Sequence, residues 1–132
     1  MPVADTEVLF TLRSGDPRHE KVARLLDSRA DIVVPDVALL EFQIVLRARG
    51  RKPAELKTAM LALREILSRH KVKEVNTISS GTLALRCELE EKYGLSYFDS
   101  LIAVAALTVD RKVVSSDKAF EAVPDLVRVP LE

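Results

Sequence analysis

The sequence predicts an α/β fold in which helices cover both faces of a mainly parallel sheet of four or five strands. Short apolar runs alternate along the chain with longer amphipathic stretches, which is the pattern of strands alternating with helices. Helical connections between strands indicate parallel pairing. The 132 residues, 48% of them hydrophobic, fit one domain spanning residues 1–132 around one sizeable core.

In the first half of the chain, each predicted boundary rests on a local signal. Asp16 and Pro17 suit the N-cap and first position of a helix, Ile32 begins a β-branched apolar run, and Gly50 suits a helix end. The predicted elements are a strand at 1–4, a short helix at 6–12 ended by Ser14-Gly15, a helix from Asp16-Pro17 to 28, a strand at 32–34 and a helix from Pro35-Asp36 to Gly50.

The second half continues the alternation. Pro53 suits a helix start and Gly94 a helix end. The predicted elements are a helix at 53–70, a strand at 72–75, helices at 80–93 and 96–109, a strand at 112–115, a helical turn near Phe120 and a strand at 127–129.

Composition excludes several classes of protein. Twenty basic residues balance 20 acidic ones, which argues against a protein that coats nucleic acid through an excess of positive charge. A metal and a few basic side chains could still bind nucleic acid locally. Cys87 is the only cysteine and is expected to be a small buried residue; with His19 and His70 far apart, a zinc site is not expected. No run approaches the ~18 apolar residues of a membrane span and no signal peptide is evident, which favours a cytoplasmic location.

Two acids follow predicted strands. Asp5 comes directly after the first strand, and Asp117 comes after the run at 113–116. Because open parallel sheets form their sites beyond the carboxyl ends of the strands, both acids are expected at one edge.

Two more acids interrupt apolar helix patterns. Glu41 shares a predicted inward stripe with five apolar residues: Val37, Leu40, Ile44, Val45 and Ala48. Asp99 is the only carboxylate in the helix from 97 to 109, which is apolar nearly all round and therefore predicted to be buried. A buried charge is costly unless something pairs with it.

Four carboxylates at one edge would need a cation. Two of them ~4 Å apart repel by ~4 kcal/mol at an effective dielectric of ~20. Because all the ligands would be oxygen atoms, the predicted ion is Mg²⁺ or Mn²⁺.

Each acid also has a purely structural interpretation. Asp99 could complete a capping pattern with Ser96, Asp117 could begin a short helix, and Asp5 could be a turn residue. Glu41 could form a buried pair with an arginine. Four such coincidences at one edge are less favoured than a shared site.

At these residues the chain resembles the PIN-domain family. The motifs are Asp5-Thr6 after the opening strand, Glu41 in PDVALLEF, Asp99 in YGLSYFDSLIAVAA and Asp117 in VVSSDKAF, and together they cover nearly the whole chain. The closest resemblance is to the small ribonuclease toxins of toxin–antitoxin pairs, often called VapC.

The resemblance implies a three-layer α/β/α sandwich, Mg²⁺ or Mn²⁺ in the acidic pocket, hydrolysis of RNA, a homodimer and a separate antitoxin protein. On this view Asp5, Asp99 and Asp117 are metal ligands, and Glu41 binds the metal or orients the attacking water. Thr6, Ser115 and Ser116 are supporting polar residues. The family often has Thr before the last acid, where this chain has serines, and no clear fifth acid for a second metal position follows Asp117.

Other functions fit less well. The alternative is a PIN-like binding or scaffold module with weak or no catalytic activity, against which four intact acids argue. A signalling receiver domain would need two adjacent acids after its first strand, and a dinucleotide enzyme would need a G-x-G-x-x-G motif that is not found here. The basic run at 47–52 could hold phosphates, but cations also simply suit a helix C-terminus.

Overall fold

The structure is a computed structural model that describes residues 1–13 and 15–131. Its elements alternate between strands and helices as the sequence predicts. They are β1 (Val3–Ala4), α1 (Thr6–Thr11), α2 (His19–Ser28), β2 (Val33–Pro35), α3 (Asp36–Ala48), α4 (Pro53–Arg69), β3 (Lys73–Val75), α5 (Ser80–Tyr93), α6 (Tyr97–Val109), β4 (Lys112–Val114), the 3₁₀ helix η1 (Lys118–Ala122) and β5 (Val127–Val129).

The strands form one sheet in the order β3-β2-β1-β4-β5, and every pairing is parallel. Val3 of the central strand β1 is in register with Val33 on one side and Val113 on the other. After β1 the chain moves outward to β2 and β3, and then returns to the other side of β1 to form β4. The strand order therefore reverses between β1 and β4, which is where open α/β sheets bind ligands.

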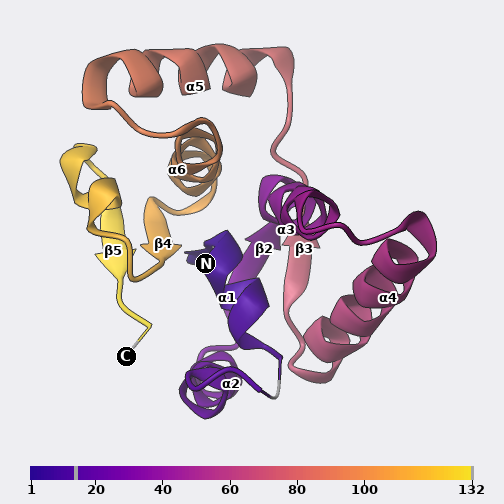
Figure 1. Cartoon of the computed structure of the whole chain (residues 1–132). Helices are drawn as coiled ribbons and strands as arrows, with labels where there is room; N and C mark the ends of the chain where they lie inside the picture. The colour runs from indigo at the N-terminus through magenta and orange to yellow at the C-terminus, as the bar shows by residue number, and fades with distance from the viewer. Residues whose placement is uncertain (14, 132) are drawn as a thin grey trace.

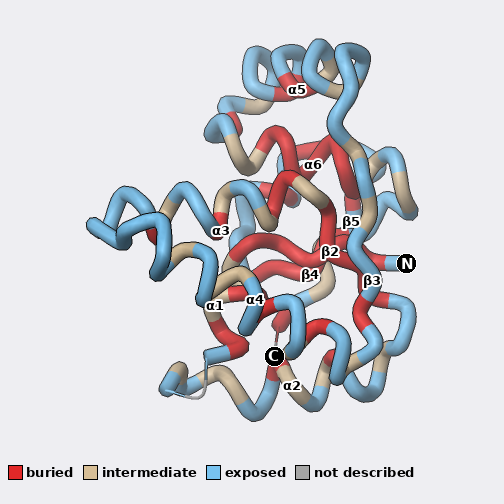
Figure 2. The backbone as a smooth tube through the Cα atoms, turned by 90° about the vertical axis from the view of Figure 1, so that its right-hand side faces the viewer, coloured by how far each residue is buried: buried red, intermediate tan, exposed pale blue. Residues whose placement is uncertain are grey.

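Helices cover both faces of the sheet, which confirms the predicted three-layer α/β/α arrangement. Figure 1 shows α5 and α6 on one side of the strands and α2 on the other. Figure 2 shows β2, β4 and α6 in the buried centre, and the outer helices and the edge strand β3 as largely exposed. Within α6 all residues from Ser100 to Ala106 are buried, as its nearly continuous apolar sequence predicts.

The start of α2 differs from the prediction. The helix begins at His19, and Asp16 does not cap it; the Asp16 carboxylate instead accepts a hydrogen bond from the Arg18 backbone N–H at 2.8 Å. This local turn satisfies Asp16 before the helix begins. The helix predicted at 6–12 ends at Thr11, and Ser14 of its predicted stop lies outside the described residues.

The predicted inward face of α3 is wrong in part. Leu40 and Ile44 are 44% and 43% exposed. The residues buried on this helix are Val37, Ala38, Phe42 and Leu46. The sequence offers two apolar stripes on α3, and the packing against α1, α4 and α6 selects one of them. Cys87 is also exposed on α5 rather than buried.

No helix within the described residues is long and apolar enough to cross a membrane.

Two glycines of α5 allow a paired test of where this helix begins and ends. Gly94 ends α5 in the left-handed conformation with φ of 66°, so Gly94→Ala should lower the free energy of unfolding by about 1–2 kcal/mol. Gly81 lies inside the first turn of α5, where an added Cβ meets only Ser79 Oγ at 3.7 Å. Gly81→Ala should therefore raise this free energy by about 0.5–1 kcal/mol. Urea unfolding followed by circular dichroism measures both, and changes of the same sign would contradict the assigned helix end.

Candidate active site

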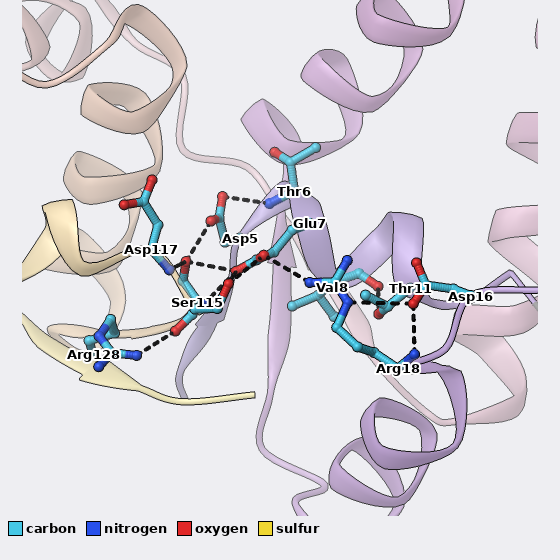
Figure 3. A network of polar contacts seen from close by, with 11 residues as sticks. Asp5, Thr6, Glu7, Val8, Thr11, Asp16, Arg18, Ser115, Asp117 and Arg128 are labelled. Atoms are coloured by element: carbon cyan, nitrogen blue, oxygen red, sulfur yellow. Dashed lines mark hydrogen bonds and ion pairs between the residues drawn. The ribbon is translucent and has the colours of Figure 1, made fainter. Parts of the chain in front are cut away.

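Where the strand order reverses, side chains connect the residues that follow β1 with those that follow β4. The Ser115 hydroxyl donates to Asp5 Oδ2 at 2.7 Å, and the Thr6 backbone N–H donates to Asp5 Oδ1 at 2.7 Å. Asp5 also donates its own backbone N–H to the Val114 carbonyl at 3.0 Å, which continues the β1–β4 pairing. With an exposed fraction of only 7%, Asp5 is thus a buried carboxylate fixed by both strands (Figure 3).

Glu41 reaches the same region from α3. The Thr6 hydroxyl donates to Glu41 Oε1, and Thr6 directly follows Asp5. Glu41 therefore pairs with a threonine, and among the described residues no arginine forms an ion pair with it. Thr6 supports both acids, Asp5 through its amide and Glu41 through its hydroxyl.

Glu7 is a fifth acid in this region, and it is not among the site residues predicted from the sequence. Its carboxylate accepts hydrogen bonds from the backbone N–H of Ser116, from the Ser116 hydroxyl at 2.7 and 2.9 Å, and from the Ser115 hydroxyl at 3.0 Å. Arg18 Nη1 lies 3.3 Å from Glu7 Oε2. Its position two residues after Asp5 was a signal, since both can follow the same strand end.

Asp99 and Asp117 occupy helix starts, as their structural interpretations proposed. Ser96 Oγ accepts from the Asp99 backbone N–H at 3.2 Å at the start of α6. Asp117 Oδ1 accepts from the Ala119 N–H at 2.9 Å at the start of η1, and the Asp117 N–H donates to Ser115 Oγ at 2.9 Å. Capping does not isolate these acids, because the charge of Asp117 acts on Asp99.

The folded site disfavours negative charge on three of the acids. Burial raises the pKa of Asp5 to about 7, with further raising by the charges of Glu7 and Asp99, against lowering by the hydrogen bonds from Ser115 and Thr6. Burial likewise raises the pKa of Glu41, with a further contribution from Asp99.

Burial, neighbouring charges and hydrogen bonds also act on Asp99 and Glu7, and they shift the two pKa values in opposite directions. Burial raises the pKa of Asp99, and the charges of Asp117 and Glu7 add to it, while the Ser96 hydrogen bond lowers it. For Glu7, burial also acts upward, but the hydrogen bonds from Ser116 and Ser115 and the charge of Arg18 bring its pKa below the ordinary value. The acids therefore influence one another across the edge of the sheet.

The carboxylates surround Ser115 without forming a closed metal cage. Figure 3 shows Asp5, Glu7 and Asp117 around this serine. Within the described residues, no group of three His, Cys, Asp or Glu side chains is placed to hold one metal ion together. The donors available are oxygen atoms, which suit Mg²⁺ or Mn²⁺, and the buried excess of acids is of the sign that attracts a cation.

The basic run at 47–52 lies at the C-terminal end of α3 and in the turn into α4. The Arg49 guanidinium lies 5.2 Å from the centre of the Phe10 ring, and Arg51 pairs with Glu55 at 3.6 Å. These contacts favour the interpretation of the run as helix-end cations.

Comparison with known protein families gives one assignment. The model of the PIN domain matches residues 3–126. The chain belongs to the PIN-domain family. The matched region includes β1 and β4, between which the strand order reverses, and all five acids described above. Comparison with curated proteins found no match.

Solved structures share this PIN fold. The VapC20 toxin of Mycobacterium tuberculosis, described as cleaving the sarcin-ricin loop, has a TM-score of 0.71 at 19% identity, covering 92% of this chain and 94% of that one. VapBC2 from Rickettsia felis, bound to a fragment of promoter DNA, gives 0.68 at 20% identity, with coverages of 97% and 96%. A toxin–antitoxin complex from Klebsiella pneumoniae gives 0.67 at 17% identity, with 96% of each chain covered.

The raised pKa of Asp5 predicts a pH-dependent stability of the metal-free PIN domain. The folded state holds a proton on Asp5 up to a pH of about 7, whereas the unfolded chain releases it near the ordinary pKa of 3.8. The unfolding free energy should therefore fall as pH rises from about 4 to 7, by an upper limit of about 4 kcal/mol from Asp5.

Asp5→Asn should flatten this dependence, because the amide does not titrate and keeps the shape of the carboxyl group. Urea unfolding of both proteins from pH 4 to 8 in a chelator measures the difference. Identical pH profiles would show that Asp5 titrates normally in the folded state.

Proposed function

We propose that this PIN domain is a metal-dependent endoribonuclease and the toxin of a toxin–antitoxin pair. The observation that carries the proposal is the position of Asp5 and Glu7 beside Ser115, at the point where the strand order reverses. Glu41 joins Asp5 through Thr6, and the charges of Asp99 and Asp117 act on one another nearby. The toxin nuclease described for the fold neighbour VapC20 is consistent with such a site.

The chemistry of the donors fits Mg²⁺ or Mn²⁺. The raised pKa values of Asp5, Glu41 and Asp99 report unfavourable negative charge, which a cation relieves. When bound, the ion polarises the scissile phosphate and lowers the pKa of a water molecule for in-line attack. Because the described side chains do not form a closed cage, the carboxylates would have to move inward around the ion.

The residues of the site have distinct proposed roles. Asp5, Asp99 and Asp117 are the proposed ligands, and Glu41 binds the metal or orients the attacking water. Ser115 and Thr6 hold Asp5 in one orientation by hydrogen bonds to its two oxygens. Such fixed orientation matters because a small displacement of a reacting group costs much of the rate.

Glu7 is the proposed additional acid near a second metal position. Ser116, predicted as a supporting residue, donates to Glu7 from both its amide and its hydroxyl and thereby holds this acid at the site. Its carboxylate already accepts hydrogen bonds from Ser115 and Ser116, so it would have to exchange some of them for the ion.

The proposed antitoxin would dock on an apolar groove of about 560 Å³ between α1, α3 and α4. Phe10, Phe42 and Leu46 line it, and its charged lining residues are Arg13, Arg51 and Glu55, of which Arg51 and Glu55 pair with each other at 3.6 Å. An amphipathic segment with an apolar face and acidic flanks complements the apolar lining and Arg13. The Klebsiella pneumoniae fold neighbour, a toxin–antitoxin complex, is consistent with this partner.

Neutralising one acid should separate catalysis from stability. Asp99→Asn should abolish Mg²⁺- or Mn²⁺-dependent cleavage of RNA, while the metal-free protein stays as stable or becomes more stable because repulsion is relieved. Gel analysis of total RNA and structured RNAs measures cleavage, and thermal unfolding in a chelator measures stability.

The matched control is Asp27→Asn, which removes an exposed carboxylate that pairs with His70 between α2 and the end of α4 and should leave cleavage unchanged. If Asp99 only caps α6, Asp99→Asn should instead lose ~0.3–1 kcal/mol of stability and retain full cleavage. That result would refute the acidic-site proposal and favour the binding or scaffold module.

The proposed homodimer has its own test. Leu40 and Ile44 leave an apolar face of α3 exposed, which is suited to contact with a second copy. Light scattering at micromolar concentration should give twice the mass of the 14.7 kDa chain. Leu40→Glu should lower this to the monomer mass, whereas Leu61→Glu, at an exposed leucine of α4, should not. A monomeric wild-type protein would contradict the proposal.

A further inference from the structure

A second cavity lies beside the acids at the same edge of the sheet. Its volume is about 280 Å³, and its lining residues are Arg18, Ser116, Arg128, Pro130 and Leu131. Two of these are arginines from opposite ends of the chain, and none is an acid. The cavity therefore presents guanidinium groups and, among the described residues, no carboxylate in its lining.

Residues that do not line the cavity hold both arginines in position by hydrogen bonds and ion pairs. Arg128 Nη1 donates to the Ser115 carbonyl at 3.1 Å, and its Nε and Nη2 donate to Glu121 Oε1 at 3.1 and 3.0 Å. Arg18 pairs with Glu7 at 3.3 Å and with Asp16 at 3.4 Å. The three acids do not line the cavity; they offset the charge of the guanidinium groups and hold them in fixed positions.

The cavity and the acids share a wall. Ser116 lines the cavity and also donates to Glu7. Ser115 binds Asp5 through its hydroxyl and Arg128 through its carbonyl (Figure 3). The cavity is therefore lined by Ser116, the residue directly before Asp117. A ligand strand bound at the acids could extend into this cavity.

We propose that this cavity binds a backbone phosphate of a single-stranded RNA, adjacent to the phosphodiester held at the acids. The inference rests on the proposed nuclease function. Guanidinium groups bind phosphate oxygens in a paired, charge-assisted geometry, and their positions here are fixed before binding. Pro130 and Leu131 supply an apolar wall for the ribose or base.

Continuity with the acidic site favours RNA over an acidic peptide. A nucleic acid strand presents phosphates at regular intervals, so it can place one at the acids and the next in the cavity. The volume, below the ~300–1,000 Å³ of pockets for drug-sized ligands, suits a phosphate with part of its sugar.

Binding of fluorescein-labelled oligouridylate in a chelator tests the cavity without cleavage. Arg128→Gln and Arg18→Gln should each weaken binding about tenfold, the loss expected for one hydrogen bond to a charged group. The slope of log K against log salt should fall by about 0.7 for each lost phosphate contact. Arg69→Gln, at an exposed arginine of α4, should change neither.

A second variant leaves both arginines in place. Pro130→Glu puts a carboxylate at an exposed position of the cavity wall and should weaken binding, whereas Pro124→Glu, at an exposed proline before β5, should not. Circular dichroism and thermal unfolding establish that each variant is folded. Loss of binding in folded Pro130→Glu would support the cavity even if Arg128→Gln fails to fold.

Three outcomes separate the proposals. Cleavage by wild type with unchanged oligouridylate binding in folded Arg18→Gln and Pro130→Glu would overturn the phosphate cavity and leave the nuclease function standing. Loss of binding in these variants without cleavage of any RNA by wild type would support the cavity and count against the nuclease. Equal weakening of polyglutamate binding in the same variants would overturn the assignment to RNA, because the cavity would then accept any polyanion.

Discussion

The site depends on Ser115, which directly follows β4 beside the end of β1. Ser115 is fully buried and contacts Asp5, Glu7, the Asp117 amide and Arg128. Its hydroxyl carries one proton and cannot donate fully to both carboxylates. Burial also raises the pKa of Asp5 to about 7, so the folded site disfavours a full negative charge there. Ser115 is therefore the residue through which the acids of β1 and β4 are connected.

Ser115 also explains how acids and bases coexist at one edge. Its hydroxyl faces the acids, while its carbonyl accepts from Arg128, so a single residue orients groups of opposite charge on its two sides. Glu7 repeats the arrangement, since its carboxylate is bound by Ser116 and by Arg18. Opposite charges are thus kept in fixed neighbouring positions, the acids near one another and the guanidinium groups at the cavity. The proposed division into a metal region and a phosphate region follows from this separation.

The sequence predicted the fold because apolar periodicity and helix-end residues report local structure directly. Strands and helices from 32 to 129 were predicted nearly to the residue, and Asp5 and Asp117 were placed at strand ends. Burial on α3 was not predictable, because Leu40 and Ile44 resemble core residues until neighbouring helices are placed. Glu7, Arg18 and Arg128 carry no periodic signal. Their roles arise only when residues over a hundred positions apart meet at β1 and β4, and a single sequence does not state such pairings.

The acids also constrain stability. Asp5, Glu41 and Asp99 are held where burial opposes their charge, so the fold must supply compensating free energy elsewhere. The apolar α6, buried from Ser100 to Ala106, supplies it while carrying Asp99 in its first turn. A cation that binds only the folded state would return part of this free energy, in proportion to the logarithm of its concentration over its dissociation constant. Metal affinity and folding stability are then two measures of the same electrostatic strain, and any substitution that relieves the strain weakens the attraction for the ion.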